Sequence, residues 1–158
     1  MITIRNASLS DIDQLSKLFD EYRIFYLVES DLPGAKAFLS ERIKNKDSEI
    51  FVAVKNAKFL VGFVQLYPLF SSTRLKRLWL LNDLYVSPGS RGQNISVMLI
   101  DKAKELSRQT NSAGLILETA KSNIIGNKLY PRTDFVLDEE HNFYSWENGG
   151  LSELKKQA

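Results

Sequence analysis

The sequence contains no cysteine and a single histidine, His141. A chain without cysteine forms no disulfide, has no thiolate nucleophile and offers no cysteine ligand to zinc. One histidine cannot supply a histidine-rich metal site, and without a partnered serine it makes no catalytic triad. We interpret His141 as a half-buried or surface residue of a terminal strand. Thiol chemistry, metal sites built on cysteine or histidine and triad hydrolysis are therefore excluded.

Long apolar runs and a strong charge of either sign are also missing. No run is long enough to span a bilayer, and the opening residues MITIRNAS lack the pattern of a secretory signal. The formal net charge of +2 is too small for a protein that neutralises many phosphates. Arg74, Lys76 and Arg77 do gather, but a solvated strand edge accounts for them. We expect a cytoplasmic protein that binds neither membrane nor nucleic acid.

The hydrophobic pattern predicts one mixed α/β (α+β) domain over residues 1–148, followed by a polar tail at 149–158. Ser10 and Asp13 resemble a capping box at the start of the first helix. The strand at 78–86 is apolar on both faces, and we expect it to be central. The predicted order is β-α-α-β-β-β-α-β-α-β-β, with strands at 2–5, 50–54, 59–66, 78–86, 115–119, 135–136 and 141–146, and helices from 12 to about 26, from about 35 to 46, after residue 92, and from 123 to 130.

The most informative stretch is LNDLYVSPGSRGQNISVMLIDKAKELSRQ, residues 81–109. An apolar strand breaks at Pro88 and Gly89, and a helical pattern begins just after Arg91 and Gly92. The first N–H groups of a helix have no intrahelical partner, and the helix dipole adds positive potential there. This strand-loop-helix segment predicts an anion-binding loop, although such turns also exist for packing alone.

A second group of polar residues follows the next predicted strand, LILET. Asn123 opens a short helix and Tyr130 lies seven residues later, two helical turns on and therefore on the same face. Both side chains would then face a ligand bound between neighbouring strands. Alternatively, Asn123 is a plain N-cap and Tyr130 a packed aromatic residue.

The two segments together resemble the GNAT superfamily of N-acetyltransferases. LYVSPGSRGQNISVMLID is similar to its acetyl-CoA signature, in which [Q/R]-x-x-G-x-[G/A] opens a helix, and Asn123, Leu129, Tyr130 and Phe135 match its downstream N…LY…F pattern. The resemblance covers essentially the whole chain and implies a central mixed, mostly antiparallel sheet flanked by helices. The segments YRIFY, QLYPLFSS and LNDLYV are similar to the diamine and small-amine branch.

The chain departs from the family pattern at three positions. Asn94 and Ser96 stand where glycine or alanine is expected, and Asp134 stands where relatives commonly carry glycine. Glycine at such positions lets a pyrophosphate approach the backbone closely. We therefore expect acetyl-CoA to bind more weakly than in a glycine-bearing relative.

The resemblance implies direct transfer of an acetyl group from acetyl-CoA to a primary amine of a small molecule or peptide. Tyr130 would protonate the departing thiolate, and Asp83 or Glu118 would relay the proton lost by the ammonium. Each of these two carboxylates also has a plain structural interpretation, as an exposed or ion-paired group. A backbone N–H near Val86 would polarise the thioester carbonyl. The implied cofactor-binding residues are Leu84, Tyr85, Val86, Arg91, Gly92, Gln93, Asn94, Ile95, Ser96, Asn123 and Lys128.

The acceptor site is expected in the loop after the first helix. Glu29 and Asp31 would attract a cationic amine there, and Tyr22 and Tyr26 would form its walls; a solvated loop and ordinary packing are the alternatives. Aromatic residues at 143–146 would pair across a homodimer or lie in a core strand. The rival hypothesis for the whole chain is a non-catalytic CoA-binding or protein-interaction module with a GNAT fold.

Overall fold

The computed structural model describes residues 1–149, and the chain divides into two compact units, residues 1–120 and the residues from 121 onward. Each unit is described by itself. The predicted tail at 149–158 lies, apart from its first residue, outside the described residues. None of the helices in residues 1–149 has the length and hydrophobicity of a transmembrane span.

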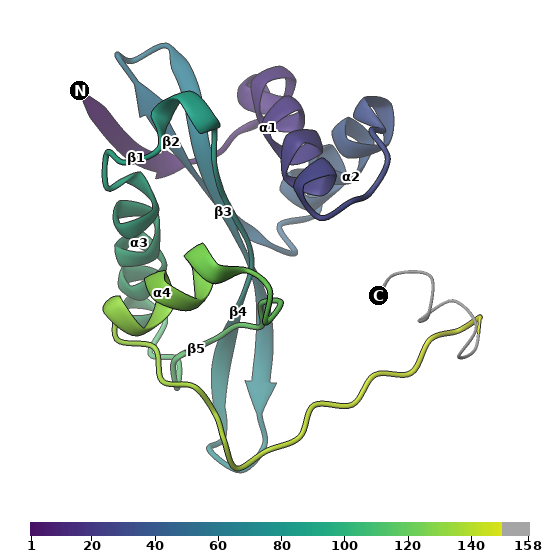
Figure 1. Ribbon diagram of the computed structural model, residues 1–158, viewed down its shortest axis with the longest axis vertical. Coiled ribbons are helices and arrows are strands. Elements are labelled where there is room, and N and C mark those ends of the chain that lie inside the picture. The colour runs from purple at the N-terminus through teal and green to yellow at the C-terminus, as the bar shows by residue number, and fades with distance from the viewer. Residues whose placement is uncertain (150–158) are drawn as a thin grey trace. The chain divides into compact units, whose positions relative to one another are not determined.

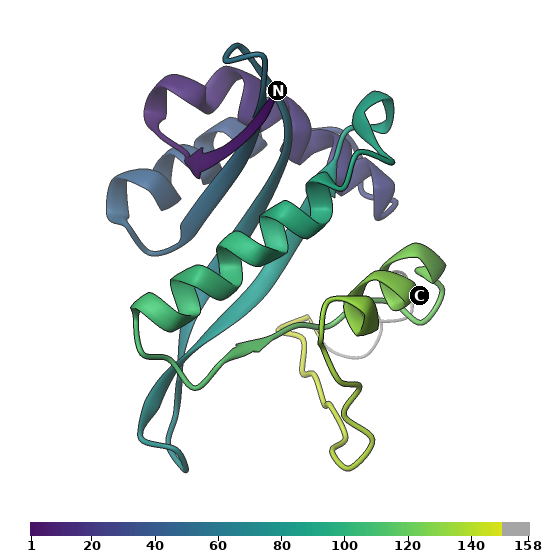
Figure 2. The ribbon, with the colours of Figure 1, turned by 90° about the vertical axis from the view of Figure 1, so that its left-hand side faces the viewer.

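The first unit is a five-stranded sheet with helices on both faces (Figure 1). Neighbouring strands are antiparallel except the last pair, β4 and β5, which is parallel. In both views of the ribbon, α1 and α2 cover one face and α3 the other (Figure 2). The sheet order follows the element numbers: β1 (Ile2–Asn6), β2 (Glu49–Lys55), β3 (Phe59–Ser71), β4 (Lys76–Val86) and β5 (Leu115–Ile116), with helices α1 (Ile12–Phe25), α2 (Leu32–Asn45) and α3 (Ile95–Gln109). The predicted fold class is confirmed.

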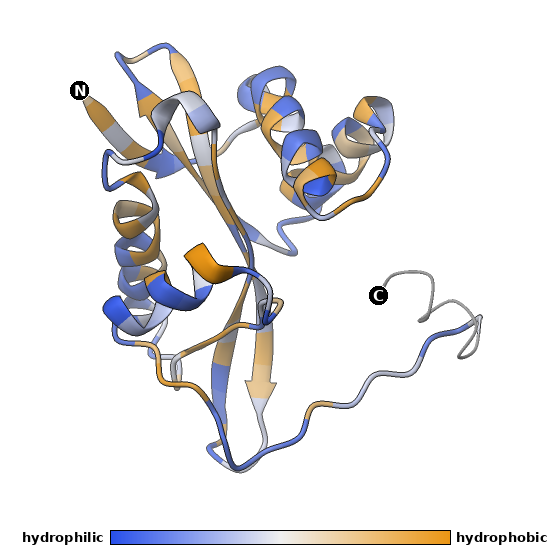
Figure 3. Cartoon of the chain, viewed as in Figure 1, coloured by the Kyte–Doolittle hydropathy of each residue, from blue (hydrophilic) through white to orange (hydrophobic). Residues whose placement is uncertain are grey.

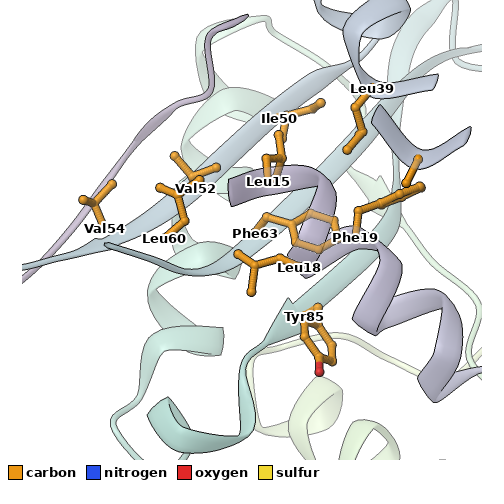
Figure 4. Close-up of a cluster of buried hydrophobic side chains, with 11 residues drawn as sticks. Leu15, Leu18, Phe19, Leu39, Ile50, Val52, Val54, Leu60, Phe63 and Tyr85 are labelled. Carbon is orange, nitrogen blue, oxygen red and sulfur yellow. The ribbon is translucent and has the colours of Figure 1, made fainter. Parts of the chain in front are cut away.

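Alternation along the strands divides the core between the two faces of the sheet. Ile50, Val52 and Phe63 belong to a cluster with buried side chains of α1 and α2, including Leu15 and Leu39 (Figure 4). On α3, the buried apolar residues recur at helical spacing: Ile95, Leu99, Ile100 and Ala103. Hydrophilic and apolar stretches therefore alternate along that helix (Figure 3).

The predicted capping box lies two residues earlier in the chain. Its members are Ser8 and Asp11, which frame a short 3-10 turn (Leu9–Asp11) before α1. The Ser8 N–H donates to Asp11 Oδ2 at 2.8 Å, and Arg5 binds the same carboxylate through both terminal nitrogens, at 2.8 and 2.7 Å. The same Ser-x-x-Asp spacing occurs at Ser10 and Asp13, but Arg5 pairs with Asp11, whereas Asp13 pairs with Lys36. The structure therefore places the cap at Asp11.

The second unit contains one helix, α4 (Ile124–Arg132), among its described residues. The strands predicted at 135–136 and 141–146 are wrong, because residues 135–149 form neither helix nor strand. His141 therefore lies on no strand; its Nδ1 is 2.8 Å from Asp138 Oδ2. Pro131 does not stop the helix at its predecessor, since α4 continues through Pro131 to Arg132.

The strand predicted at 115–119 is also shorter than expected. Only Leu115 and Ile116 pair, with Trp79 and Leu80 of β4. From Leu81 onward, β4 is therefore an edge on its β5 side and not the central strand that its apolar sequence suggested. This open edge is the first feature of the candidate site.

Candidate functional site

The end of β4 presents backbone groups that no described strand pairs. The Ser87 N–H donates to the Val61 carbonyl at 2.9 Å, so Ser87 faces β3. Because strand residues alternate, Val86 and Leu84 face the opposite side, where β5 pairs only with Trp79 and Leu80. The main chain of Leu84 and the N–H of Val86 are thus available to an extended ligand, whereas the Val86 carbonyl accepts a hydrogen bond from Arg91.

A β-bulge at Asn82 produces this orientation. Gln65 pairs with Asp83 and Leu66 with Leu81, so Asn82 is the extra residue of β4. The bulge reverses the alternation, because Trp79 before it donates its N–H to Gly114 on the β5 side. The same alternation makes the Tyr85 backbone face β3, and the Tyr85 side chain is buried on the α1 face. Of the three predicted β4 contacts, therefore, only Leu84 and the Val86 N–H offer free main-chain groups.

The loop after β4 forms a row of unpaired N–H donors. It includes a 3-10 turn (Pro88–Ser90) and two left-handed residues, Gly92 with φ of 75° and Asn94 with φ of 62°. Within the described residues, no acceptor is assigned to the backbone N–H groups from Gly92 to Ser96. Five consecutive free donors at the start of a 15-residue helix make a site for an anion.

The departures from glycine are tolerated differently at the two positions. Asn94 occupies the left-handed region, which asparagine adopts more readily than most residues, and its side chain makes no capping hydrogen bond. Ser96 lies in the first turn of α3, where backbone angles are helical and a glycine is not needed. Of these two residues, only Asn94 therefore stands where conformation favours glycine; the third departure, Asp134, is also left-handed, with φ of 66°.

Arg91 lies beside both features. Its Nε donates to the Val86 carbonyl at 3.0 Å, and its guanidinium lies 5.6 Å from the centre of the Tyr85 ring. The Tyr85 hydroxyl is 3.4 Å from Glu21 Oε2, and in Figure 4 this hydroxyl points away from the buried cluster. Burial, followed by the charge of Glu21, raises the pKa of Tyr85. Arg91 thus brings a positive charge to the junction of the strand edge and the loop.

Asp83 is a buried carboxylate at the bulge, with 4% of its surface exposed. Gln65 Nε2 donates to its Oδ2 at 2.8 Å, and Asn82 Nδ2 donates to its Oδ1 at 3.0 Å. Burial raises the pKa of Asp83, while hydrogen bonds from Gln65, Tyr22 and Asn82 lower it. Burial and the nearby Asp83 charge also raise the pKa of Tyr67. Asp83 is therefore a carboxyl group with a basicity above the ordinary value, as a proton acceptor needs.

Glu118, the other predicted relay, lies on no strand. It follows β5 in an irregular segment and is exposed. The structure therefore favours Asp83 over Glu118 as the buried carboxylate of this region.

The predicted acceptor residues lie at the end of α1 and in the loop before α2. Tyr22 and Tyr26 pack edge to face, with ring centres 5.0 Å apart, and Tyr22 also contacts the rings of Phe63 and Tyr85. The Tyr22 hydroxyl is 3.4 Å from the Asn82 carbonyl at the bulge. The aromatic residues thus pack, and they also connect α1 to the edge of β4.

The two acidic residues of this loop have different surroundings. Asp31 is the N-cap of α2, where its Oδ1 accepts from the Gly34 N–H at 2.9 Å. Glu29 is exposed, and its carbonyl accepts from Arg23. Asp20 on α1 holds the loop, since it accepts hydrogen bonds from the Ser30 hydroxyl and the Asp31 N–H. A residue absent from the sequence predictions, Asp20, is therefore what orders the predicted acceptor loop.

In the second unit, Asn123 and Tyr130 mark the two ends of α4. Asn123 Oδ1 accepts from the Gly126 N–H at 3.1 Å, which is an N-cap. Beyond Tyr130, the Asp134 N–H donates to Pro131 and the Phe135 N–H to Tyr130, which is the Schellman pattern with Asp134 left-handed at φ of 66°. The rings of Tyr130 and Phe135 lie 5.7 Å apart. The N…LY…F pattern is thus a capped helix that fixes Tyr130, while Lys128 is exposed on it.

The first unit therefore brings together most of the predicted residues: the edge of β4, the N–H row before α3, Asp83 and the tyrosines of α1. Asn123, Lys128 and Tyr130 belong to the second unit. The sequence predictions did not include three residues near Asp83: Gln65, Ser48 and Tyr67. Of these, Gln65 could have been noticed, because it is the one polar residue in the apolar run FLVGFVQL.

Comparison with known proteins identifies relatives along nearly the whole chain. Residues 13–135 match the Acetyltransferase (GNAT) family. The chain is 40% identical over 137 residues to YhfO of Bacillus subtilis, an uncharacterised N-acetyltransferase, covering 87% of this chain and 91% of that protein. It is 35% identical over 112 residues to a probable acetyltransferase of Haemophilus influenzae, covering 71% of this chain and 77% of that protein.

Solved structures agree with these matches. One crystal structure of a probable acetyltransferase superposes with a TM-score of 0.87 at 36% identity, covering 92% of this chain and 97% of the other. A predicted acetyltransferase of Clostridium acetobutylicum, crystallised with acetyl-CoA, superposes with a TM-score of 0.74 at 18% identity, covering 92% and 96%. At that identity the likeness shows the fold alone.

Proposed function

Because this chain belongs to the GNAT family of acetyltransferases, we propose that it transfers the acetyl group of acetyl-CoA directly to a primary amine of a small molecule or peptide. The observation that carries the proposal is the row of free N–H donors from Gly92 to Ser96 beside the unpaired edge of β4. The N–H row suits a phosphate, and the free main-chain groups at the edge of β4 suit an amide-bearing arm that lies along a strand.

The residues present fit the cosubstrate. Gly92 supplies a left-handed turn without a Cβ, and Arg91 adds a positive charge next to the N–H row. The N–H of Leu84 or Val86 would donate to the thioester carbonyl and stabilise its developing negative charge. Bound acetyl-CoA supplies an activated acyl group with a thiolate leaving group. Asn123 and Lys128 remain proposed contacts to its arm.

Proton transfers would be divided between two residues. Asp83, through water, accepts the proton that the substrate ammonium must lose before its nitrogen can attack the carbonyl carbon. The new C–N bond forms as the C–S bond breaks, and Tyr130 gives its phenolic proton to the departing sulfur. The acylated nitrogen then still carries two protons, and it gives one of them to the Tyr130 phenolate, which restores the phenol. A phenol with pKa of about 10 is a suitable acid for a thiolate whose conjugate acid has a pKa of about 8.5.

The acceptor would enter beside the loop before α2, where Tyr22, Tyr26 and Glu29 lie. We further propose that residues 1–148 act as one domain, since the family match crosses residue 120. The aromatic side chains at 143–146 are largely exposed and support a homodimer: Phe143, Tyr144 and Trp146.

The variant Tyr130→Phe tests the acid role. It retains the ring that packs on Phe135 and removes only the hydroxyl, so α4 should stay capped. We expect kcat to fall by roughly 100-fold or more while the KM for acetyl-CoA changes little. Steady-state thiol release provides the measurement, with Tyr144→Phe as the matched control. An unchanged kcat in Tyr130→Phe would remove Tyr130 from this role.

A further inference from the structure

A polar relay crosses the buried face of the sheet beneath α1. Ser48, in the connection between α2 and β2, donates its hydroxyl proton to Gln65 Oε1 at 2.9 Å. Gln65, on β3, donates from Nε2 to Asp83 Oδ2 at 2.8 Å. Gln65 is 0% exposed and Asp83 4%. The relay therefore links three elements through one buried amide.

The geometry gives the Gln65 amide a defined orientation. Its oxygen accepts from a hydroxyl and its nitrogen faces a carboxylate, so the opposite rotamer would point two acceptors at each other. Gln65 and Asp83 are also direct cross-strand partners, which makes their spacing a property of the sheet and not of flexible side chains. The Asp83 carboxylate is thereby held at one oxygen, while Asn82 holds the other.

A buried amide is not needed at this position for the core. The neighbouring β3 residue on the same face of the sheet, Phe63, is fully buried and apolar. An unpaired buried amide costs stability, so its presence is explained by the group that it binds. That group is Asp83.

We propose that Gln65, oriented by Ser48, is a positioning residue that fixes the Asp83 carboxylate and sets the pH range in which it accepts a proton. The inference rests on the proposed function, because it assumes that Asp83 is the proton acceptor. The other ionisable groups that face Asp83 are Tyr22 from α1 and Tyr67 from β3, and Arg42 and Asp47 act on Tyr67 in turn.

The sign of the effect follows from the hydrogen bonds. A donor to the ionised carboxylate lowers its pKa, so removing the Gln65 amide raises the pKa of Asp83 above its already raised value. A proton acceptor with a higher pKa is ionised only at higher pH. The acidic limb of kcat/KM must then move to higher pH, and activity at a fixed pH on that limb must fall.

The test compares pH profiles of kcat/KM for the amine, measured on the full chain with acetyl-CoA. Gln65→Met removes the amide at similar length and should move the acidic limb upward by about one pH unit, a tenfold change in the ionised fraction. Ser48→Ala should move it in the same direction by less. The matched control is Gln14→Met, which likewise loses an amide that makes two hydrogen bonds, in this case to the backbone of Lys58 and Leu60. Gln14 is exposed.

Thermal melting of each variant keeps the result interpretable. If Gln65→Met is folded and its acidic limb coincides with those of wild type and Gln14→Met, the inference is overturned. If Gln65→Met does not fold, the Ser48→Ala profile decides in the same way. The variant Asp83→Asn distinguishes the proposed proton acceptor from the positioning role of Gln65. Full activity in Asp83→Asn overturns both. Loss of activity in Asp83→Asn, together with an unmoved acidic limb in Gln65→Met, overturns the positioning role alone.

Discussion

Single residues shape the loop before α3, where we propose that an anion binds. Gly92 and Asn94 are both left-handed, but only Gly92 lacks a side chain. Asparagine keeps the conformation and narrows the space in front of the N–H row. The sequence comparison with the family pattern treated Asn94 and Ser96 as equal departures; the structure separates them, because Ser96 has helical geometry.

The variant Asn94→Gly should therefore bind acetyl-CoA more tightly than wild type. Glycine keeps the left-handed conformation and removes the side chain in front of the donor row, an effect of about 1–2 kcal/mol, or roughly 5- to 30-fold in Kd. Isothermal titration calorimetry gives the value directly. Ser96→Gly is the control and should bring no gain, since glycine inside a helix weakens it. Equal affinity of Asn94→Gly and wild type would contradict this account of the loop.

Pattern reasoning cannot find which residues pair when the two partners are distant in sequence. Gln65 and Asp83 meet across two strands, and Asp20 meets residues 30 and 31 only after the chain has turned between α1 and α2. The capping box at Ser8 and Asp11 is a related case. Its local spacing was found at Ser10, but the ion pair with Arg5 selects the earlier pair.

At the scale of elements, the loop between α1 and α2 is held from one side. Asp20 accepts from Ser30 and from the Asp31 backbone, and Arg23 donates to the Glu29 carbonyl. The pKa of Asp20 is lowered chiefly by the Ser30 hydroxyl, as expected of a carboxylate that is a hydrogen-bond acceptor. These contacts keep the proposed acceptor residues in place before any ligand binds.

Replacing Asp20 with alanine should raise the KM for the amine by roughly 5- to 30-fold, because the substrate would have to order the loop on binding. The KM for acetyl-CoA should stay unchanged, since the N–H row lies on another element. Asp13→Ala is a matched control on α1: it removes the ion pair with Lys36 of α2 but leaves the loop contacts intact. Equal changes in both Michaelis constants would show that Asp20 serves stability alone.

Most elements of the first unit follow from the sequence. The amphipathic spacing of α1 and α3, the alternation of β1 and the apolar runs of β2 and β3 need no distant information to be seen. The length of β5 does depend on residues distant in sequence, because a strand ends where its pairing with the neighbouring strand ends. The residues at 115–119 and 141–146 have strand-like composition, yet only Leu115 and Ile116 are paired.

At the scale of the whole molecule, the anion loop, the open strand edge and a buried carboxylate belong to one compact unit, and a capped helix carries Tyr130 in the other. The family match spans both. The sequence supported the family and the cosubstrate because their motifs are local. In our proposal the choice of acceptor depends on side chains from α1, the following loop and β4, and no local motif contains that combination.

The central claim is acetyl transfer to a primary amine, and an acceptor panel tests it most directly. The wild-type chain is incubated with acetyl-CoA and, in turn, with diamines, polyamines, amino acids and lysine-bearing peptides, while free thiol and acetylated amine are both quantified. We predict thiol release with at least one primary amine, with one N-acetyl product formed for each thiol. No thiol release with any amine, together with no thermal shift on adding CoA, would contradict the account and favour a non-catalytic module.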